Sequence, residues 1–289
     1  MEKQFYKLEN VKSFEPTHIF ECGQCFRWNV QEDLSYTGIF KNNVLNVKKE
    51  NNSIIISGIC DGNIQKIVED YFDLNRNYEE IKERLAKVDE NLKIAEEYGS
   101  GIRLLNQDLW ETIISFIISA NNNIPRIKKI IERIAKKYGE KILFENKEYY
   151  TFPNVESLSK ATVEDLRELG LGFRDKRIYD TTKIILEKQI DLEELEKIKD
   201  VNLLREKLME LPGVGEKVAD CVMLFSSLKR LEVFPVDVWV RRVMNDLYIN
   251  KPDENKVSKE EVRKIAKQKY GNLAGIAQQY LFYWKRETS

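Results

Sequence analysis

The chain has 289 residues, and its 42% hydrophobic and 33% charged residues are typical of a globular protein with a substantial core rather than a disordered one. No apolar run approaches the ~18 residues of a membrane helix, and four cysteines in this length do not suggest a disulfide framework. The net charge of −1 differs from the basic balance common among nucleic-acid binders, although a local basic face can coexist with an acidic remainder.

The first 60 residues are rich in short β-type runs separated by turn-forming residues. Their close spacing favours an antiparallel meander over a parallel sheet. The predicted strands are residues 25–28, 35–40, 44–47 and 53–56.

After about residue 61 helical patterns follow almost without a break, apart from a predicted loop at residues 145–154. We therefore expect an α+β protein, with a small antiparallel β-rich N-terminal domain and its following helices in residues 1–100 and an all-helical domain in residues 101–289. The predicted helices are residues 64–72, 78–87, 109–120, 127–138, 163–169, 177–187, 201–210, 216–228, 238–247, 259–270 and 273–285.

Residues 211–215, Leu-Pro-Gly-Val-Gly, separate two of these helices. Gly213 and Gly215 flank one apolar residue, a pattern that predicts a tight turn with accessible backbone N–H groups. Those groups and the free N–H groups of the next helix are suited to an anion such as a DNA phosphate. The alternative is an αα-hairpin that only turns the chain.

Lys217 falls in the first turn of the helix after this hairpin, where the helix dipole disfavours a positive charge and so favours the neutral amine. A neutral lysine is the form that acts as a nucleophile and forms Schiff bases. Cys221, four residues further on, shares its helical face. Taken alone, Lys217 would be interpreted as a surface lysine and Cys221 as a small core residue. Because both follow this hairpin on one helical face, together they indicate a reactive site.

Asp237 follows Pro235 and stands where the N-cap of the helix at 238–247 belongs. The structural interpretation is a capping aspartate. A carboxylate in this place can also stabilise a cationic sugar transition state and orient the nucleophile.

Residues 211–221, followed by 234–237, resemble the helix-hairpin-helix glycosylase superfamily, and more narrowly the 8-oxoguanine DNA glycosylase/AP lyases of the eukaryotic type. Four further segments match the narrower family in order along the chain. They are Gly-Gln-Cys-Phe-Arg-Trp at 23–28, Asn-Asn-Asn-Ile-Pro-Arg-Ile at 121–127, Gly-Leu-Gly-Phe-Arg at 170–174 and Ala-Gly-Ile-Ala-Gln-Gln-Tyr-Leu-Phe at 274–282.

The resemblance implies a chemical role for Lys217, which would attack C1′ of the extruded nucleotide, displace 8-oxoguanine and form an imine before β-elimination nicks the strand. Asp237 would assist the displacement. The Gly23 carbonyl would accept the N7–H that distinguishes 8-oxoguanine from guanine. The other base-recognition residues that the resemblance implies are Cys221, Pro235, Gln278 and Phe282.

The resemblance also implies a DNA-binding set. Asn121, Arg126 and Arg174 would serve the orphaned cytosine, and Phe173 would fill the gap left by base flipping. Gly213, Gly215, Val218 and Trp239 would lie along the phosphates. Three positions depart from the family pattern: Trp239 replaces a phosphate-binding histidine, Phe173 a tyrosine, and Cys25 a serine.

Other classes of protein remain as alternatives. Alkylpurine glycosylases generally lack the hairpin lysine, and the endonuclease III-like branch carries a C-terminal iron–sulfur cluster, whereas the cysteines here are 22, 25, 60 and 221. A non-catalytic DNA-binding module or a helical interaction protein would need neither Lys217 nor Asp237. The pair Cys22 and Cys25 lacks a second pair with zinc-ligand spacing, and the sole histidine, His18, is not expected to be a ligand.

We therefore expect a reaction that requires no cofactor, metal or iron–sulfur cluster, with a monovalent cation at the hairpin left open. The expected partner is double-stranded DNA containing 8-oxoguanine, and the expected state is a monomer without membrane contact. The N-terminus lacks the apolar stretch of a signal peptide, so we expect an intracellular protein, cytoplasmic in a prokaryote and nuclear in a eukaryote.

Overall fold

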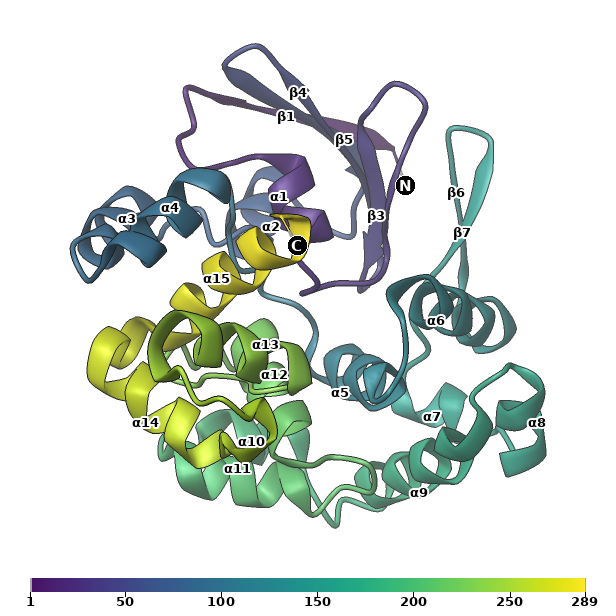
Figure 1. Ribbon diagram of the computed structural model, residues 1–289. Coiled ribbons are helices and arrows are strands. Elements are labelled where there is room, and N and C mark those ends of the chain that lie inside the picture. The colour runs from purple at the N-terminus through teal and green to yellow at the C-terminus, as the bar shows by residue number, and fades with distance from the viewer. Residues whose placement is uncertain (1, 289) are drawn as a thin grey trace.

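The computed structural model describes residues 2–288 and contains a twisted antiparallel sheet built from the first 60 residues, with helices making up most of the rest (Figure 1). The predicted α+β class is confirmed. The strands of the sheet are β1 (Lys3–Glu9), β2 (Trp28–Val30), β3 (Tyr36–Phe40), β4 (Asn43–Glu50) and β5 (Ser53–Ile59).

The order of the strands across the sheet is β1-β5-β4-β3-β2, and every neighbouring pair is antiparallel. β2 to β5 form the expected meander. The first predicted run was misplaced, because only Trp28 of residues 25–28 lies in β2. β1 was not predicted; it is an edge strand whose inward residues are only half-buried, and the apolar Phe5 lies on its exposed face.

An aromatic core under the sheet holds it against α1 and α2. The rings of Phe20 and Trp28 stack with 4.0 Å between centroids, and those of Phe40 and Tyr71 with 3.8 Å. The Trp28 indole N–H also donates to the Tyr71 hydroxyl at 2.9 Å. This packing fixes the segment that leads from α1 to β2, which carries Gly23.

The helices after the sheet follow the predicted pattern with small changes of boundary. α6 begins three residues earlier than expected, because Asn123 accepts from the Arg126 N–H and caps it. The helices are α1 (Pro16–Glu21), α2 (Ile64–Tyr71), α3 (Tyr78–Ala86), α4 (Glu90–Tyr98), α5 (Leu109–Ser119), α6 (Ile124–Tyr138), α7 (Val155–Leu158), α8 (Val163–Glu168), α9 (Asp175–Leu186), α10 (Leu192–Lys197), α11 (Val201–Met209), α12 (Glu216–Phe225), α13 (Val238–Met244), α14 (Lys259–Tyr270) and α15 (Ala274–Thr288).

Several elements were missed. The predicted loop at residues 145–154 is wrong, because the hairpin of β6 (Lys141–Phe144) and β7 (Lys147–Tyr150) forms there. The short helices α1, α4, α7 and α10 were not predicted. The helix predicted at residues 238–247 ends as α13 at Met244, and a π-helix, η2 (Asn245–Ile249), follows it. Three short 3₁₀ helices are also present in the described residues: η1 (Gly172–Arg174), η3 (Glu254–Lys256) and η4 (Gly271–Leu273).

The last helix, α15, joins the two parts of the molecule. It packs along α4 and ends beside α1, near the sheet (Figure 1). The larger hydrophobic core includes Cys22 and Phe26 from the N-terminal part together with residues of α5, α12 and α15. The segment carrying Gly23 therefore lies against α15. Within residues 2–288, no helix is long and apolar enough to cross a membrane.

Candidate active site

The turn between α11 and α12 has the form expected of residues 211–215. Gly213 has φ +91°, a conformation that favours glycine, and a Cβ there would lie close to two side chains, 3.0 Å from Cδ of Arg177 and 3.1 Å from Cγ2 of Ile117. Gly215 caps α12 with its backbone, and its Cα faces open space. The first N–H groups of α12 thus begin at an unobstructed surface.

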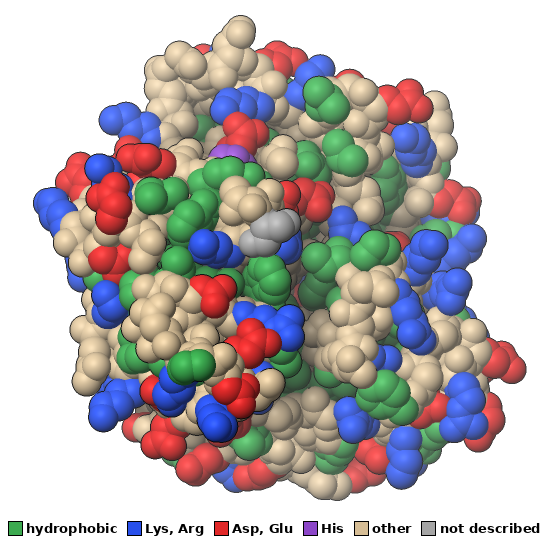
Figure 2. All heavy atoms as spheres, viewed as in Figure 1, with side chains coloured by type: hydrophobic (Ala, Val, Ile, Leu, Met, Phe, Trp, Pro, Cys, Tyr) green, Lys and Arg blue, Asp and Glu red, His purple; other side chains and the backbone are tan. Residues whose placement is uncertain are grey.

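A groove of about 610 Å³ runs along this hairpin. Figure 2 shows the face hollowed along its middle, between the helices around α13 and those around α5 and α6. The residues that line the groove come from the end of α5, the hairpin and α12, the start of α13, and α14: Ser119, Ala120, Asn121, Asn122, Gly213, Gly215, Glu216, Lys217, Val218, Val236, Asp237, Val238, Trp239 and Lys259.

Lys217 is the second residue of α12 and is partly buried. Its Nζ lies over the ring of Phe116, 5.4 Å from the centroid. Phe116 is itself fixed in the core, with its ring stacked on Phe225 at 5.5 Å. The amine is therefore held against one rigid aromatic wall rather than extended into solvent.

Cys221 follows Lys217 by one helical turn, as its spacing predicts, and is buried. Burial raises the pKa of the Cys221 thiol to about 11, although the neighbouring Lys217 acts in the opposite direction. At neutral pH the thiol is therefore protonated. It offers an uncharged, polarisable surface to whatever enters the site.

Asp237 caps α13 as predicted, since its Oδ1 accepts from the Val240 N–H at 2.8 Å. Asp237 and Lys217 each line both the groove and a second, smaller pocket behind it. The carboxylate and the amine thus lie at the passage between the two spaces. A group entering the pocket from the groove must pass both.

The inner pocket collects the base-recognition residues that the sequence predicts. Gly23 has φ +82°, and a Cβ there would lie 3.4 Å from Cε1 of Phe282, so the ring of Phe282 packs directly over Gly23. The lining comprises Cys22, Gly23, Phe116, Lys217, Cys221, Phe225, Pro235, Asp237, Val240, Gln278, Gln279 and Phe282. The volume is about 50 Å³, room for one or two water molecules of about 30 Å³ each, so a larger guest requires the walls to move.

Of the predicted opposite-base residues, only Asn121 lines the groove, and Arg126 lines a separate depression at the start of α6. Phe173 is 56% exposed, and the guanidinium of Arg174 lies 4.2 Å from the centre of its ring. Asn121 is exposed with φ +51° and lines the groove. Arg126 is exposed and donates to the Gly170 carbonyl at 3.3 Å.

Arg174 differs from this group, because it is only 1% exposed. Its guanidinium donates to the carbonyls of Ala120 and Leu171 and, at 2.8 Å, to that of Asn121. It therefore closes the C-terminal end of α5 and holds Asn121 in place. A direct role toward an opposite base stays a prediction, and it requires these bonds to break.

Two further groove residues differ from the simplest expectation. The Trp239 indole N–H is buried and has no hydrogen-bond partner in this conformation, so it does not face the open groove as a phosphate donor would. The side chain of Val218 is also buried, which leaves its backbone as the part available to DNA. Both residues line the groove through their other atoms.

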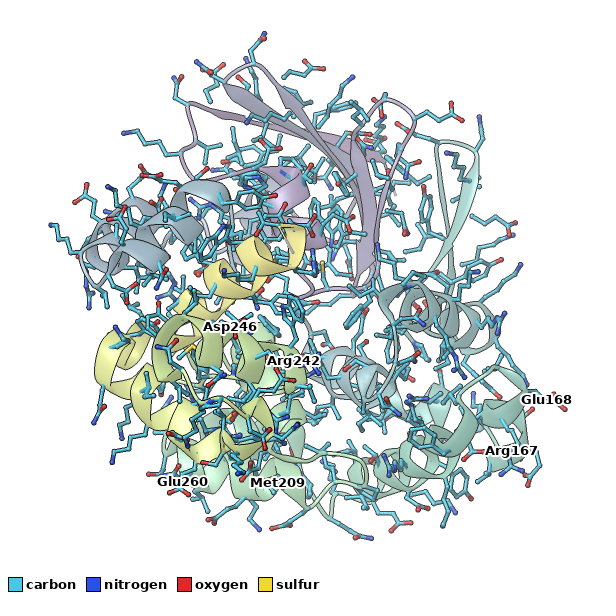
Figure 3. The ribbon with its side chains drawn as sticks, in the orientation of Figure 1. Arg167, Glu168, Met209, Arg242, Asp246 and Glu260 are labelled. Atoms are coloured by element: carbon cyan, nitrogen blue, oxygen red, sulfur yellow. The ribbon has the colours of Figure 1, made fainter. Side chains whose placement is uncertain are left out.

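Some of the arginines of the helical region are held in ion pairs. Figure 3 shows Arg242 on α13 near the middle of the view and Arg167 on α8 at the right. Arg242 lies 2.9 Å from Glu254, and Arg167 lies 2.7 Å from Asp175. Backbone N–H groups at the hairpin are thus a more available source of phosphate contacts than these arginines.

Cys22, Cys25 and His18 make hydrogen bonds to the backbone. The thiol of Cys22 donates to the Ile19 carbonyl at 3.3 Å and that of Cys25 to the Phe20 carbonyl at 3.8 Å. His18 accepts from the Gly101 N–H through Nδ1 at 3.2 Å. In the described part of the chain, no three His, Cys, Asp or Glu side chains gather in a way that would hold a metal ion.

Five residues that line the pocket were not anticipated from the sequence: Cys22, Phe116, Phe225, Val240 and Gln279. Phe116 belongs to α5, whose residues from Leu109 to Ile118 are nearly all buried, so no periodicity distinguishes the one that faces Lys217. Gln279 follows the predicted Gln278 directly, and helical spacing gives no reason to expect both in one pocket.

Two family models match consecutive parts of the chain. Residues 7–113 match the 8-oxoguanine DNA glycosylase N-terminal domain, and residues 114–270 match the HhH-GPD superfamily of base excision DNA repair proteins. The chain belongs to this superfamily, within the branch that carries the 8-oxoguanine glycosylase N-terminal domain.

The similar proteins include curated relatives and a solved structure. A probable N-glycosylase/DNA lyase of Methanothermobacter thermautotrophicus is 34% identical over 78% of this chain and 76% of its own. The N-glycosylase/DNA lyase of Saccharomyces cerevisiae is 30% identical over 98% of this chain and 86% of its own. The Clostridium acetobutylicum 8-oxoguanine glycosylase/lyase, solved with double-stranded DNA containing cytosine opposite 8-oxoguanine, is 43% identical with a TM-score of 0.93, covering 99% of this chain and 97% of its own.

Proposed function

We propose that this protein is a bifunctional DNA glycosylase/AP lyase of base excision repair that removes 8-oxoguanine from duplex DNA and then nicks the strand. The observation that supports this most is the position of Lys217 and Asp237, at the passage between an open groove and a pocket lined by Gly23 and Phe282. An extruded nucleotide with its base in the pocket places its sugar beside both side chains.

The nitrogen lone pair of Lys217 attacks C1′ as the glycosidic bond breaks, and the base leaves with the bonding electron pair and takes up a proton. Asp237 stabilises the positive charge that develops on the sugar. Loss of a proton from the attacking nitrogen and opening of the sugar ring give an imine. Removal of a C2′ proton then expels the 3′ phosphate and cuts the strand.

The base is held between an apolar and a polar set of groups. The Phe282 ring and the uncharged Cys221 thiol cover its faces, and Pro235 closes one side of the pocket. The Gly23 carbonyl accepts the N7–H that guanine lacks, and Gln278 holds the Watson–Crick edge. These steps use only side chains and backbone of this chain, and a monovalent cation at the hairpin stays a prediction.

Double-stranded DNA is bound along the groove, with the backbone of Gly213, Gly215 and Val218 against phosphates. Phe173, exposed on the surface, fills the gap left by the extruded base. Asn121 in the groove and Arg126 in the neighbouring depression face the opposite base. We propose a monomer as the active form. An enzyme acting on genomic DNA works inside the cell; its compartment, the cytoplasm of a prokaryote or the nucleus of a eukaryote, stays a prediction.

Single-turnover reactions test this function. Purified protein is mixed with duplexes containing 8-oxoguanine, guanine, or the alkylated bases 3-methyladenine or 7-methylguanine, and both released base and cut strand are measured. We expect release of 8-oxoguanine with nicking of the same strand, and no release of guanine. Equal release of guanine, or release of alkylated bases alone, would contradict the proposal.

A further inference from the structure

Two adjacent glutamines lie buried at the inner end of the pocket. Gln278 is 5% exposed and Gln279 is 3% exposed, and both line the pocket with Phe282. The Gln279 Nε2 donates to the Gln278 Oε1 at 2.8 Å. The contact joins the two amides into one polar unit in an otherwise largely apolar wall.

The Oε1 of Gln279 is buried and accepts no hydrogen bond. A buried acceptor without a donor costs about 1–3 kcal/mol. Within residues 2–288 twelve buried side-chain polar atoms lack a partner, and only the Gln279 oxygen belongs to a residue that lines the pocket. This acceptor belongs to a residue that lines the pocket proposed for the base. The missing donor is therefore best supplied by the molecule that fills the pocket.

We propose that Gln279 is a second base-reading residue, whose Oε1 accepts a hydrogen bond from the exocyclic 2-amino group of a purine. The inference rests on the proposed function. Guanine-type bases carry, side by side, an O6 acceptor, an N1–H donor and a 2-amino donor. Gln278 satisfies the first two with its amide, and Gln279 satisfies the third.

The bond between the glutamines also sets the orientation of Gln278. Because the Gln279 amide donates to the Gln278 Oε1, the oxygen end of Gln278 is turned toward Gln279 and its Nε2 is turned away. The oxygen keeps a second lone pair for the N1–H of the base. The pair selects the donor–donor edge of guanine-type bases and rejects 8-oxoadenine, whose N1 is an acceptor.

The first test varies the substrate. Duplexes carry either 8-oxoguanine or 8-oxohypoxanthine, which has the same edge without the 2-amino group. Loss of one buried hydrogen bond is expected to slow single-turnover release of 8-oxohypoxanthine by about tenfold. Equal rates on the two substrates would overturn the proposal.

The second test varies the protein. Gln279→Met keeps the volume of the side chain but removes both its acceptor and the bond that orients Gln278. Release of both bases is therefore expected to slow, and release of 8-oxoguanine by about tenfold more than that of 8-oxohypoxanthine. Gln279→Glu keeps an acceptor but loses the bond donated to Gln278, so it is expected to be slower on both bases and to keep the preference for 8-oxoguanine. The matched control is Gln268→Met, at an exposed position of α14. An unchanged preference in Gln279→Met would show that Gln279 does not read the base.

Nicking of a preformed abasic site separates this proposal from the proposed function. That reaction needs the Lys217 amine but no base in the pocket, so each folded Gln279 variant should nick abasic DNA at the wild-type rate. If the wild type releases no 8-oxoguanine, the proposed function has failed. If the wild type releases 8-oxoguanine and Gln279→Met keeps the preference for it, only the role of Gln279 has failed. If Gln279→Met misfolds and loses abasic nicking, Gln279→Glu is used in its place. Loss of the preference for 8-oxoguanine in Gln279→Glu would then contradict the role of Gln279.

Discussion

The Nζ of Lys217 lies 5.4 Å from the centre of the Phe116 ring, across the contact between α12 and α5. The ring is 3% exposed and is wedged between Phe26 and Phe225, each with its ring centroid 5.5 Å away. An amine on a flexible four-carbon chain is thus held against a rigid surface. Such positioning lowers the entropy lost when the nucleophile meets the sugar.

Phe116→Leu tests this positioning. Leucine keeps most of the apolar contact but removes the flat ring, so we expect imine formation to slow by about tenfold while the free energy of unfolding falls by only about 1–2 kcal/mol. Borohydride trapping measured over time gives the first quantity and chemical denaturation the second. Trapping at the wild-type rate would mean that the ring does not position the amine.

Asp237 has a structural role that must be separated from its proposed chemical one. Asparagine caps helices about as well as aspartate, so Asp237→Asn should change the free energy of unfolding by less than about 0.5 kcal/mol. The same substitution removes the negative charge, and we expect single-turnover base release to slow by about 100-fold. If the rate is unchanged, Asp237 is only the cap of α13.

Arg174 and Arg126 should behave differently when substituted. Arg174→Met removes buried hydrogen bonds to three carbonyls, and we expect a loss of about 3 kcal/mol in the free energy of unfolding. Arg126→Ala, at an exposed position, should cost less than about 0.5 kcal/mol. Its effect should be on excision opposite cytosine relative to thymine, adenine or guanine. Identical rates opposite all four bases in the wild type would remove the opposite-base role from both residues.

The thiols provide a prediction on pH. Burial raises the pKa of Cys221 and of Cys60 to about 11 and that of Cys22 to about 12, so each is a neutral thiol below these values and a thiolate above them. At pH 8 only about one Cys221 in a thousand is ionised. We expect iodoacetamide to leave the native protein unmodified at pH 8 and to react with all four cysteines after denaturation. Rapid alkylation of Cys221 in the native protein, identified by mass spectrometry, would contradict this.

The features that were predicted correctly from the sequence are those set by the local geometry of the chain. The spacing of Lys217 and Cys221, the cap formed by Asp237 and the turn at Gly213 all follow from helix geometry and glycine conformation, and each is found in the structure. β1 was missed because the apolar Phe5 lies on its exposed face and the polar Gln4 on its half-buried face, so apolar and polar residues do not alternate cleanly along it.

Contacts between distant elements could not be predicted in this way. Phe116 lies on a helix that is apolar on every side, so only tertiary packing selects it as the neighbour of Lys217. The burial of Arg174 against the end of α5 depends on carbonyls that are more than fifty residues away in the chain. The unpaired oxygen of Gln279 becomes visible only when its neighbours are known.

The central claim is that Lys217 is the nucleophile, and borohydride trapping on DNA containing 8-oxoguanine tests it most directly. The wild type and the control variant Lys264→Gln, on α14, should form a covalent protein–DNA adduct, and mass spectrometry should place the DNA remnant on Lys217. Lys217→Gln should form no adduct while it still binds the duplex. An adduct of equal yield with Lys217→Gln, or a remnant on another residue, would contradict the mechanism.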